Sequence, residues 1–364
     1  MNLIELHILQ SVPVSCLNRD DAGNPKSAVF GGANRARVSS QAWKRAIRVH
    51  ARENFPELPF KGIRSRFLLE PLTEALKKHG AEKPEEAAET IAKVFSSLQS
   101  EKNRGSSDVT TAVFLSPAEI DSIAAAVVAG KTPSAAAKKA QRNDAADIAL
   151  FGRMVANDSS LNVEAAALFA HALSTHSVDH ELDFYTAVEE NPRRSDGESS
   201  TDPGAAMMGN LGFTSATYYR YIALNIDQLA MNLPGLEPEI LQKIVEAFLR
   251  SSLEAIPGAR EATMNGQTRP GFVLGVRRQK GSPVQLVNAF ERPVISANGV
   301  LEKSASLLLK EHAYLGDAWG VQPDLALVIK HRLELDEDTP TQPERVGLED
   351  FVGRLASATS LTPA

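Results

Sequence analysis

The order of strand-like and helix-like patterns along the chain constrains its fold more than any other feature of the sequence. Alternating apolar residues predict strands, and apolar residues spaced three or four apart predict amphipathic helices. The strands are expected at residues 4–8, 165–178, 219–226 and 272–276, and the helices at 39–54 and 240–249. Once residues 61–149 are set aside, the order is strand, helix, strand, strand, helix, strand. This α+β order is the ferredoxin-like arrangement, which RNA-recognition domains also use.

Residues 61–149 differ in composition from the rest of the chain. They are rich in Ala, Glu and Lys, and their apolar residues follow helical spacing, so we expect a helical insertion. Loops are expected over residues 11–38 and over the polar residues 189–204. The second strand segment, 165–178, is expected to begin as a helix. Further predicted elements are a strand at 284–290 that pairs with 272–276, a helix at 301–315 and a strand at 325–331.

Composition limits the class of protein. With 364 residues, 43% of them hydrophobic, the chain can form roughly two domains and bury a sizeable core. Its one cysteine, Cys16, cannot form an internal disulfide framework or a cysteine-rich zinc site. The longest apolar run, 123–129, is too short to span a bilayer, and the N-terminus lacks the basic region of a signal peptide. These features predict a cytoplasmic protein without a membrane partner.

The net charge of −6 argues against a nucleic-acid partner, but the charge is unevenly distributed. Seven basic residues lie between Lys26 and Arg52, and this window contains no Asp or Glu. In a helix, Lys44, Arg48 and Arg52 share one stripe, and Trp43 lies on the opposite side. Because surfaces normally mix charges of both signs, this segregation predicts a groove for phosphates, with an affinity that falls as salt rises.

The start of the same helix is a second candidate for phosphate binding. Ser39 and Ser40 place hydroxyl groups at the helix N-terminus, where free backbone N–H groups favour an anion. A phosphate held there would lie close to Arg37. The alternative interpretation is a solvated basic face without a ligand, which is the usual role of a run of charges.

Two methionines give a weaker signal. Met208 lies at the end of the polar loop, and Met154 follows a glycine and an arginine. Apolar side chains of this kind can wedge between stacked bases, although an isolated methionine more often fills a core.

Candidates for catalysis or metal binding are poorly supported. His171, His176 and His180 are close in sequence, but the order H-E-x-x-H is absent and strand geometry would separate them, so structural or surface histidines are expected. Asp20 and Asp21 could hold a divalent cation, although aspartate in such a loop more often forms a turn. The sequence therefore predicts no catalytic residue, no metal and no cofactor.

Several short motifs point to one known family. The N-terminal motifs are SCLNRDD (15–21), FGG (30–32), RARVSSQ (35–41) and KRAIR (44–48). The later motifs are DIALFGRM (147–154), THSVD (175–179), FYTAV (184–188), YRY (219–221) and NAFE (288–291). Together they resemble the CasC (Cse4) family, the backbone subunit of the type I-E CRISPR surveillance complex Cascade. The resemblance covers most of the chain and is weakest in the helical insertion and after residue 334.

The resemblance implies a hand-shaped, non-catalytic protein. Its parts would be an RRM-like palm (1–60, 150–189 and 217–340), helical fingers (61–149), a protruding thumb loop (190–216) and a C-terminal tail (341–364). Members of the family line up head-to-tail along CRISPR RNA, about six copies to a complex, which is an open heterologous assembly. They also contact other Cascade subunits.

The resemblance also implies which residues contact the guide RNA. Its backbone would be held by Arg19, Lys26, Arg35, Arg37, Ser39, Ser40, Gln41, Lys44, Arg45 and Arg48. Met208 of the thumb and Met154 beside the palm would kink the guide and displace one base at regular intervals. Between the kinks, exposed bases would pair with target DNA, so that Watson–Crick pairing reads the sequence.

Two other hypotheses remain open at this stage. One is a metal-dependent endoribonuclease of the same fold that uses Asp20 or Asp21. The other is a structural assembly protein without direct RNA contact, which the acid-free basic stretch disfavours. Cleavage of bound RNA in the presence of Mg²⁺ would distinguish the enzyme from the binding protein.

Overall fold

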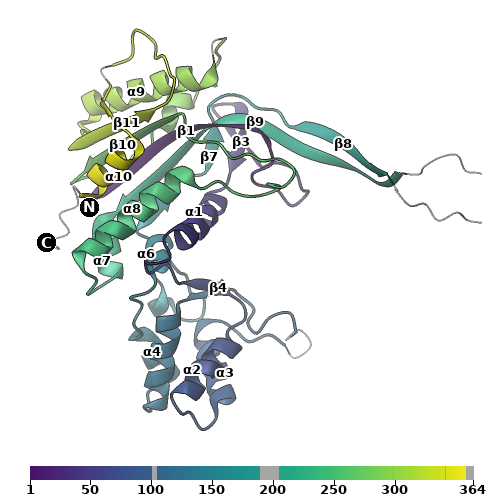
Figure 1. Ribbon diagram of the computed structural model, residues 1–364, viewed down its shortest axis with the longest axis vertical. Helices are drawn as coiled ribbons and strands as arrows, with labels where there is room; N and C mark the ends of the chain where they lie inside the picture. The colour runs from purple at the N-terminus through teal and green to yellow at the C-terminus, as the bar shows by residue number, and fades with distance from the viewer. Residues whose placement is uncertain (101–104, 189–204, 298, 341, 358–364) are drawn as a thin grey trace, which may run out of the picture.

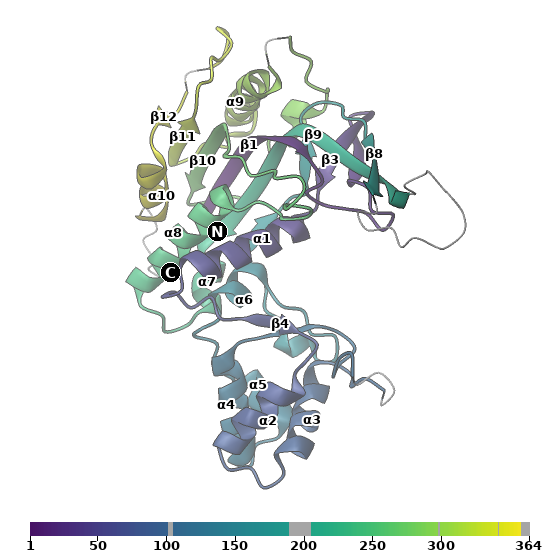
Figure 2. The ribbon, with the colours of Figure 1, turned by 45° about the vertical axis from the view of Figure 1, so that its right-hand side comes forward.

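The computed structural model describes residues 1–364 apart from 101–104, 189–204, 298, 341 and 358–364, and it gives only the backbone of 186–188 and 205–208. Figures 1 and 2 show three parts: a sheet flanked by helices, a helical lobe below it, and a two-stranded arm that projects from the sheet. We call these parts the palm, the fingers and the thumb.

The palm contains the predicted ferredoxin-like core. Its strands are β1 (Leu3–Ser15), β6 (Ala167–Phe169) with β7 (Ala172–Ser174), β9 (Ala205–Asn225) and β10 (Phe272–Arg278), and its helices are α1 (Ser40–Asn54) and α8 (Pro238–Glu254). The strand order is β10, β1, β9, β7, and all neighbours are antiparallel. Each split βαβ unit therefore has one antiparallel strand between its two parallel strands, as the ferredoxin-like fold requires. The α+β fold expected from the sequence is confirmed.

Helices cover both faces of this sheet. Ile4, Leu6 and Ile8 of β1 pack in one cluster with α1 and α8. Leu9 and Tyr219 lie on the opposite face, in a cluster with α9 (Val300–Trp319). RNA-recognition domains stack bases on aromatic side chains of their sheet. Because α9 packs on the corresponding face here, that face is closed to such stacking.

Residues 284–290 do not form the strand expected from their sequence. The strand that they were expected to join, β10, already pairs with β1 and with β11 (Leu325–Lys330), which leaves it no free edge. Backbone N–H groups of the segment bond to side chains of the sheet instead, and the segment ends in the 3-10 helix η3 (Val287–Phe290). The expected helix at 301–315 and strand at 325–331 are confirmed as α9 and β11.

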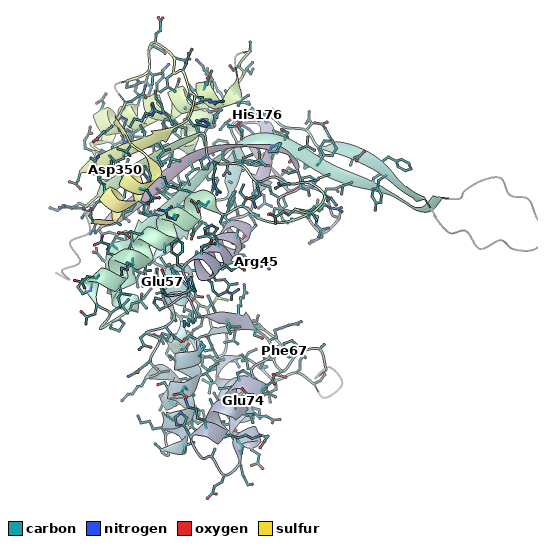
Figure 3. The ribbon with its side chains drawn as sticks, viewed as in Figure 1. Arg45, Glu57, Phe67, Glu74, His176 and Asp350 are labelled. Atoms are coloured by element: carbon teal, nitrogen blue, oxygen red, sulfur yellow. The ribbon has the colours of Figure 1, made fainter. Side chains whose placement is uncertain are left out.

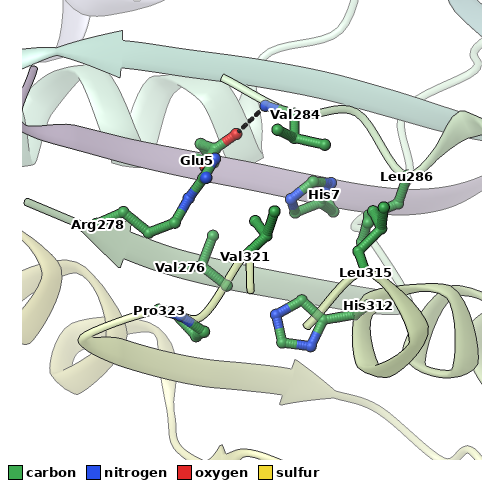
Figure 4. Close-up of a pocket in the computed structure, with 10 residues that line it drawn as sticks. All are labelled: Glu5, His7, Val276, Arg278, Val284, Leu286, His312, Leu315, Val321 and Pro323. Carbon is green, nitrogen blue, oxygen red and sulfur yellow. Dashed lines mark hydrogen bonds and ion pairs between the residues drawn. The ribbon is translucent and has the colours of Figure 1, made fainter. Parts of the chain in front are cut away.

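A buried polar network holds this segment against the sheet (Figure 4). The Glu5 carboxylate accepts hydrogen bonds from the Val284 N–H at 2.8 Å and from the Tyr221 hydroxyl at 2.5 Å, and it forms an ion pair with Arg278. Beside this network, His7 lines a cavity of about 20 Å³. Burial disfavours a charged imidazole and lowers the pKa of His7 to about 3. His7, beside the network, is therefore neutral at physiological pH.

Two segments expected to be loop or helix contain strands. In residues 11–38, β1 continues to Ser15 and is followed by a hairpin of β2 (Ser27–Phe30) and β3 (Ala33–Val38). The hairpin turn at Gly31 and Gly32 has φ angles of 58° and 73°, which glycine adopts without strain. Residues 165–178 contain no helix, because β6 and β7 both pair with β9. Each of these strands has only three residues, which is too few for alternation to be recognised in the sequence.

The fingers form a separate helical lobe. They contain α2 (Leu69–Lys78), α3 (Pro84–Phe95), α4 (Pro117–Val128), α5 (Pro133–Lys138) and a small sheet of β4 (Ile63–Ser65) and β5 (Val113–Leu115). Leu72 and Ile91, from two of the helices, belong to one buried cluster. Val155 and Leu161, from beyond the insertion, also bury in it, whereas α6 (Ala146–Phe151) packs in the palm core. The fingers thus have a core of their own.

The thumb is a long antiparallel hairpin. The strand β8 (Glu181–Val188) pairs with the outer half of β9, from Glu181 opposite Phe213 to Val188 opposite Ala205. Residues 205–216 are therefore strand rather than the loop expected over 190–216, while 189–204 lie outside the described residues. The inner half of β9 belongs to the palm sheet, so one continuous strand connects palm and thumb.

The C-terminal residues join the palm. The strand β12 (Glu344–Arg345) runs parallel to β11, and α10 (Leu348–Ser357) buries Phe351 and Leu355 in the cluster that contains α8. The helix α7 (Ile226–Asn232) links β9 to α8. Residues 341–364, set apart as a tail in the sequence, therefore include a helix of the core. Among the residues with a described structure, no helix is long and apolar enough to cross a membrane.

Candidate nucleic-acid interface

The basic face expected for residues 39–54 lies on α1. The Ser39 hydroxyl accepts a hydrogen bond from the Ala42 N–H at 3.2 Å and caps the helix. Trp43 is buried against the palm, while Lys44 is half-buried and Arg45 is exposed on other sides of the helix. Figure 3 labels Arg45 on α1. Helical periodicity therefore separates the apolar and basic residues as the sequence predicts.

The basic residues of α1 line a cleft between the palm and the fingers. Its volume is about 300 Å³. The lining residues are Gln41, Lys44, Arg45 and Arg48 of α1, Arg64, Thr111, Ala112 and Phe114 of the fingers, and Phe151, Gly152, Arg153 and Met154 at and after the end of α6. We refer to Lys44, Arg45, Arg48 and Arg64 as the cleft cations. Four segments that are separate in sequence thus meet at one cationic site.

Two of the cleft cations, Lys44 and Arg48, lie over aromatic rings. The Lys44 ammonium lies 5.4 Å from the ring centroid of Phe169, and the Arg48 guanidinium lies 4.9 Å from that of Phe114. In the part of the chain that the structure describes, none of the cleft cations forms an ion pair with a carboxylate. Burial lowers the pKa of Lys44 and of Arg48. An anion bound in the cleft would offset the free-energy cost of burying these charges and would reduce the repulsion between them.

One buried carboxylate lies beneath the cleft. The Oδ1 atom of Asp147 accepts hydrogen bonds from the Gly62 N–H at 3.1 Å and from the Ile148 N–H at 3.0 Å. Burial raises the pKa of Asp147 to about 6, although these bonds and the nearby charge of Arg48 oppose the shift. Asp147 therefore fixes the start of the fingers to α6, and it lies inside the protein rather than on the cleft surface.

Arg35 does not fit its expected role in RNA binding. Its side chain is fully buried, and its guanidinium donates to carbonyl oxygens of Ser174, Thr175, Phe290 and Glu291, at distances of 2.8 to 3.1 Å. Five N–H donors in a fixed fork suit such a set of acceptors. Arg35 therefore joins the hairpin to β7 and η3 and is inaccessible to a ligand. Sequence alone could not reveal this burial, because the other arginines of the same stretch are exposed or half-buried.

The expected anion site at the N-terminus of α1 is occupied by protein groups. The Ser39 N–H donates to Oδ1 of Asn18 at 2.9 Å, and the Ser40 N–H donates to Nδ1 of His171 at 3.0 Å. The Ser39 hydroxyl oxygen accepts a hydrogen bond from the Ala42 N–H. Since these donors are already bonded, the helix N-terminus is not the open phosphate site that the sequence suggested.

Arg19, Lys26 and Arg37 form a second basic group beside the start of α1. Arg19 forms an isolated bridge with Pro25, and the Lys26 N–H donates to the carbonyl of Asn18 at 2.9 Å. The Lys26 carbonyl accepts from the Arg37 N–H at 2.9 Å. The structure thus divides the expected RNA-binding residues into this group and the cleft.

The two methionines are placed differently. Met154 lines the cleft, and 83% of its side-chain surface is exposed. Its side chain is therefore accessible from the cleft, although other large apolar residues, such as Ile295 and Trp319, are exposed to a similar extent. Met208 lies on β9 opposite Thr186 in the thumb, and its side chain is outside the described part of the structure.

The alternative metal and catalytic candidates do not converge. The Nδ1 atom of His171 accepts from Ser40, while Nε2 of His176 accepts from the Thr217 N–H at 3.2 Å. His180 is a separate residue with a buried Nδ1 that has no partner among the described groups. Asp20 uses its Oδ1 atom to accept the Asn24 N–H at 2.9 Å, in the turn that its sequence context favours. No group of three potential metal ligands occurs within the described residues.

Sequence reasoning missed Arg64. This residue lies on β4, opposite Phe114, and brings a charge from the fingers to the basic face of α1. A signal was present, because residues 61–67 contain three basic residues and no acid. The ring of Phe67, at the end of this segment, is also exposed (Figure 3).

Comparisons with known proteins show which family shares this fold. The family model described as "CT1975-like protein" matches residues 4–353. A solved chain from "CRISPR RNA-guided surveillance complex, pre-nicking" is 27% identical, with a TM-score of 0.80, over 98% of this chain and 99% of that chain. A second solved chain, from "CRISPR RNA-guided surveillance complex", is 23% identical, with a TM-score of 0.64 over the same shares of both chains, and shows a similar fold. No curated protein matches. The chain therefore belongs to the CT1975-like protein family, and the resemblance to the CasC (Cse4) family noted in the sequence is confirmed.

Proposed function

We propose that this protein is a non-catalytic, cytoplasmic backbone subunit of a CRISPR RNA-guided surveillance complex. In this role, about six copies line up head-to-tail along a CRISPR RNA, as in a heterologous open assembly, and contact other subunits of the complex. The proposal is supported by the fold shared with a surveillance-complex chain at 27% identity over almost the full length. The YRY motif at residues 219–221, which contributes to the resemblance in sequence, lies in the palm on β9.

The single observation that supports RNA binding is the cleft whose four cations, Lys44, Arg45, Arg48 and Arg64, form no ion pair with a carboxylate among the described residues. Its charges come from α1 and from β4, which are separate in sequence, so the cationic site is a property of the folded chain. Lys44 and Arg48 lie one helical turn apart, a spacing that lets one nucleic-acid backbone contact both. Each phosphate contact releases counterions, so the affinity depends on salt and not on sequence.

The covered sheet explains how the guide would remain readable. Because α9 occupies the face on which RNA-recognition domains stack bases, the palm would hold the RNA by its phosphates and leave base edges free. These bases can then pair with target DNA. Met154, exposed beside the cleft, is suited to wedge against a base where the guide is kinked, and Met208 of the thumb is the second candidate for this role.

Charge reversal in the cleft tests the proposal. The variant with Lys44→Glu and Arg48→Glu is expected to lose copurifying RNA and to lose binding of a labelled single-stranded RNA, with its thermal unfolding unchanged. Lys243→Glu, an exposed site on α8 outside the cleft, makes the same kind of charge change and is expected to retain binding. RNA binding by the cleft variant at the level of the wild type would contradict the proposal.

The same preparations test the absence of catalysis. Guide RNA with a complementary RNA strand is incubated with the protein in Mg²⁺ and in EDTA, and we expect the strands to remain intact in both. Regular cleavage in Mg²⁺ that disappears in Asp20→Ala or Asp21→Ala would replace the non-catalytic assignment with a metal-dependent endoribonuclease.

A further inference from the structure

The hairpin of β2 and β3 joins the palm sheet through a very short ladder. In the described structure, the pairing of β3 with β7 consists of Arg37 opposite Leu173 and Val38 opposite Ala172. The rest of the hairpin, up to its turn, extends beyond this ladder. Because an isolated two-stranded hairpin is only marginally stable, its position on the palm depends on further contacts.

Arg35 of β3 makes such contacts with two other segments of the palm. Its Nη1 atom donates to the carbonyls of Ser174 and Thr175, at 3.0 Å and 2.9 Å. Its Nη2 atom donates to the carbonyls of Phe290 and Glu291, at 2.8 Å and 3.1 Å. The first pair lies at the end of β7, and the second lies at the end of η3. One guanidinium therefore ties the hairpin to both segments.

Other groups of the hairpin support this junction. Asn34 accepts the Val178 N–H at 3.1 Å with its carbonyl and donates its side-chain amide to the Val178 carbonyl at 2.9 Å. The turn residue Gly31 approaches Glu291 so closely that a Cβ atom there would lie 1.6 Å from the Glu291 carbonyl oxygen. The hairpin thus fits one place on the palm, with Arg35 at its centre.

The hairpin carries two basic side chains, Lys26 and Arg37. The Lys26 carbonyl accepts the Arg37 N–H at 2.9 Å, so that the two residues move as a unit. Both side chains are half-buried, and neither forms an ion pair with a carboxylate among the described residues. Burial and the nearby charge of Arg37 lower the pKa of His171, which accepts the Ser40 N–H at the start of α1. Arg37 therefore lies close to the basic helix.

We propose that Arg35 is a positioning residue for RNA binding, which fixes the hairpin so that Lys26 and Arg37 contact RNA phosphates beside the start of α1. Arg35 is fully buried and does not touch the RNA itself. Its removal leaves four carbonyl groups without this donor, and an unpaired buried acceptor is costly. The hairpin then shifts away from the palm and takes both cations with it. This inference rests on the proposed function, because it assigns an internal residue to the same RNA-binding face.

The salt dependence of RNA binding distinguishes this role from a purely structural one. Each phosphate contact with a single strand contributes about 0.7 to the slope of log affinity against log salt. Misplacement of Lys26 and Arg37 together therefore lowers the slope by about 1.4. A loss of stability that leaves the hairpin in place does not change the number of phosphate contacts, so the slope stays the same.

Four proteins are compared for binding of a labelled single-stranded RNA at several salt concentrations. They are the wild type, Arg35→Met, the double variant Lys26→Met with Arg37→Met, and the triple variant that combines all three changes. We expect Arg35→Met to bind about tenfold more weakly or worse, with a slope reduced by about 1.4, as in the double variant. The triple variant should show no further reduction. Addition of Lys44→Met to Arg35→Met should lower the slope by a further 0.7 or about that, because the cleft is a separate contact.

Leu355→Ala is the control for a general loss of stability. Leu355 is a buried residue of α10, in the core cluster that includes residues of β10 and β11, toward the edge of the sheet opposite to β2. Thermal unfolding should show that Leu355→Ala is destabilised, whereas its salt slope should equal that of the wild type. A reduced slope in this control would attribute the effect of Arg35→Met to lost stability and would overturn the proposal.

Three other results would also count against the proposal. A wild-type slope in Arg35→Met would show that the hairpin does not need Arg35. A further fall of about 1.4 in the triple variant would show that Lys26 and Arg37 keep their contacts without it. A wild-type slope in the double variant, with a reduced slope in Lys44→Met, would exclude the hairpin from the RNA-binding face and leave the proposed function intact. If the wild type binds no RNA, the proposed function itself fails.

A second pair of variants tests the junction if Arg35→Met does not fold. Gly31→Ala pushes the hairpin turn away from the Glu291 carbonyl, which is an acceptor of Arg35, and leaves Arg35 and both cations in the chain. Gly32→Ala, at a similar positive φ but facing open space, is the matched control. We expect the salt slope to fall in Gly31→Ala and to remain at the wild-type value in Gly32→Ala. Equal slopes in these two variants would refute the proposal.

Discussion

Replacing Arg153 with methionine is expected to lower the free energy of unfolding of the fingers by about 3 kcal/mol. Arg153 lies immediately before the exposed Met154, and its guanidinium pairs with Glu119 at 2.7 Å. Only 1% of the arginine side chain and none of the glutamate side chain is exposed. Arg153→Met therefore leaves a carboxylate inside the fingers, together with carbonyl groups of Phe114 and Leu161 that lose a donor.

The expected loss of stability follows from the surroundings of the Glu119 carboxylate. Breaking one partner of a buried ion pair costs about 3–5 kcal/mol. Arg142 lies 3.6 Å from the same carboxylate and is 29% exposed, so it can compensate part of the stranded charge. The expected loss is therefore at the lower end of the range. In the double variant Arg153→Met with Glu119→Leu, both charges are absent, and we expect more than half of the lost stability to return.

Urea unfolding combined with hydrogen exchange measures both quantities. Protection should fall in α2, α3 and α4, which share a core with the residues after Arg153, and should change little in α8 of the palm. A single variant that loses less than about 1 kcal/mol would refute the assignment of a buried ion pair. A double variant that is no more stable than the single one would show that the carbonyl contacts, and not the stranded carboxylate, dominate.

Two further results are expected. Because the pKa of Asp147 is raised from 3.8 to about 6, the folded chain holds the Asp147 proton more tightly than the unfolded chain, and this residue makes stability fall as pH rises from about 4 to about 6. In urea titrations, Asp147→Asn should gain about 2 to 3 kcal/mol of stability relative to the wild type across that pH range. A difference that does not change with pH would contradict the pKa shift. Gly31→Ala would place a Cβ atom 1.6 Å from the Glu291 carbonyl oxygen, whereas Gly32→Ala meets open space at a similar positive φ. Thermal unfolding should therefore show a loss of stability of about 3 kcal/mol for Gly31→Ala and about 1 kcal/mol for Gly32→Ala. Equal losses in the two variants would exclude the steric explanation.

Much of the palm could be predicted from sequence because its central elements are strongly periodic. The helix over 40–54 buries one side, and this leaves a helical period in the sequence. Residues 4–8 are buried on both faces, but Glu5 and His7 on one face bond to tyrosine hydroxyl groups, so apolar and polar residues still alternate. The hairpin of β2 and β3 and the short strands β6 and β7 lie toward an edge of the sheet, where several side chains are partly exposed. Residues 284–290 alternate as a strand does, but no sheet edge was free for them.

The candidate site shows the same division at the level of single residues. The basic face of α1 follows from helical spacing, and the structure has it. Arg35 was expected to contact RNA, but it is buried, and its guanidinium donates hydrogen bonds to backbone carbonyl groups of the protein instead. Arg64 is added by the fold, since β4 brings it to the cleft from outside the basic window. Local sequence gives the charge of each residue, whereas the packing of other segments gives its accessibility.

The sequence by itself determined the order of the core elements and the segregation of basic residues on one helix. Both are properties of contiguous residues, which periodicity and local charge record directly. Only the tertiary structure decided that α9 closes one face of the sheet, that α1 and the fingers share a cationic cleft, and that Arg35 is buried among carbonyl groups of other segments. Those properties depend on contacts between residues far apart in the chain, because the packing of separate elements against one another determines which side chains are buried and which charges have a partner.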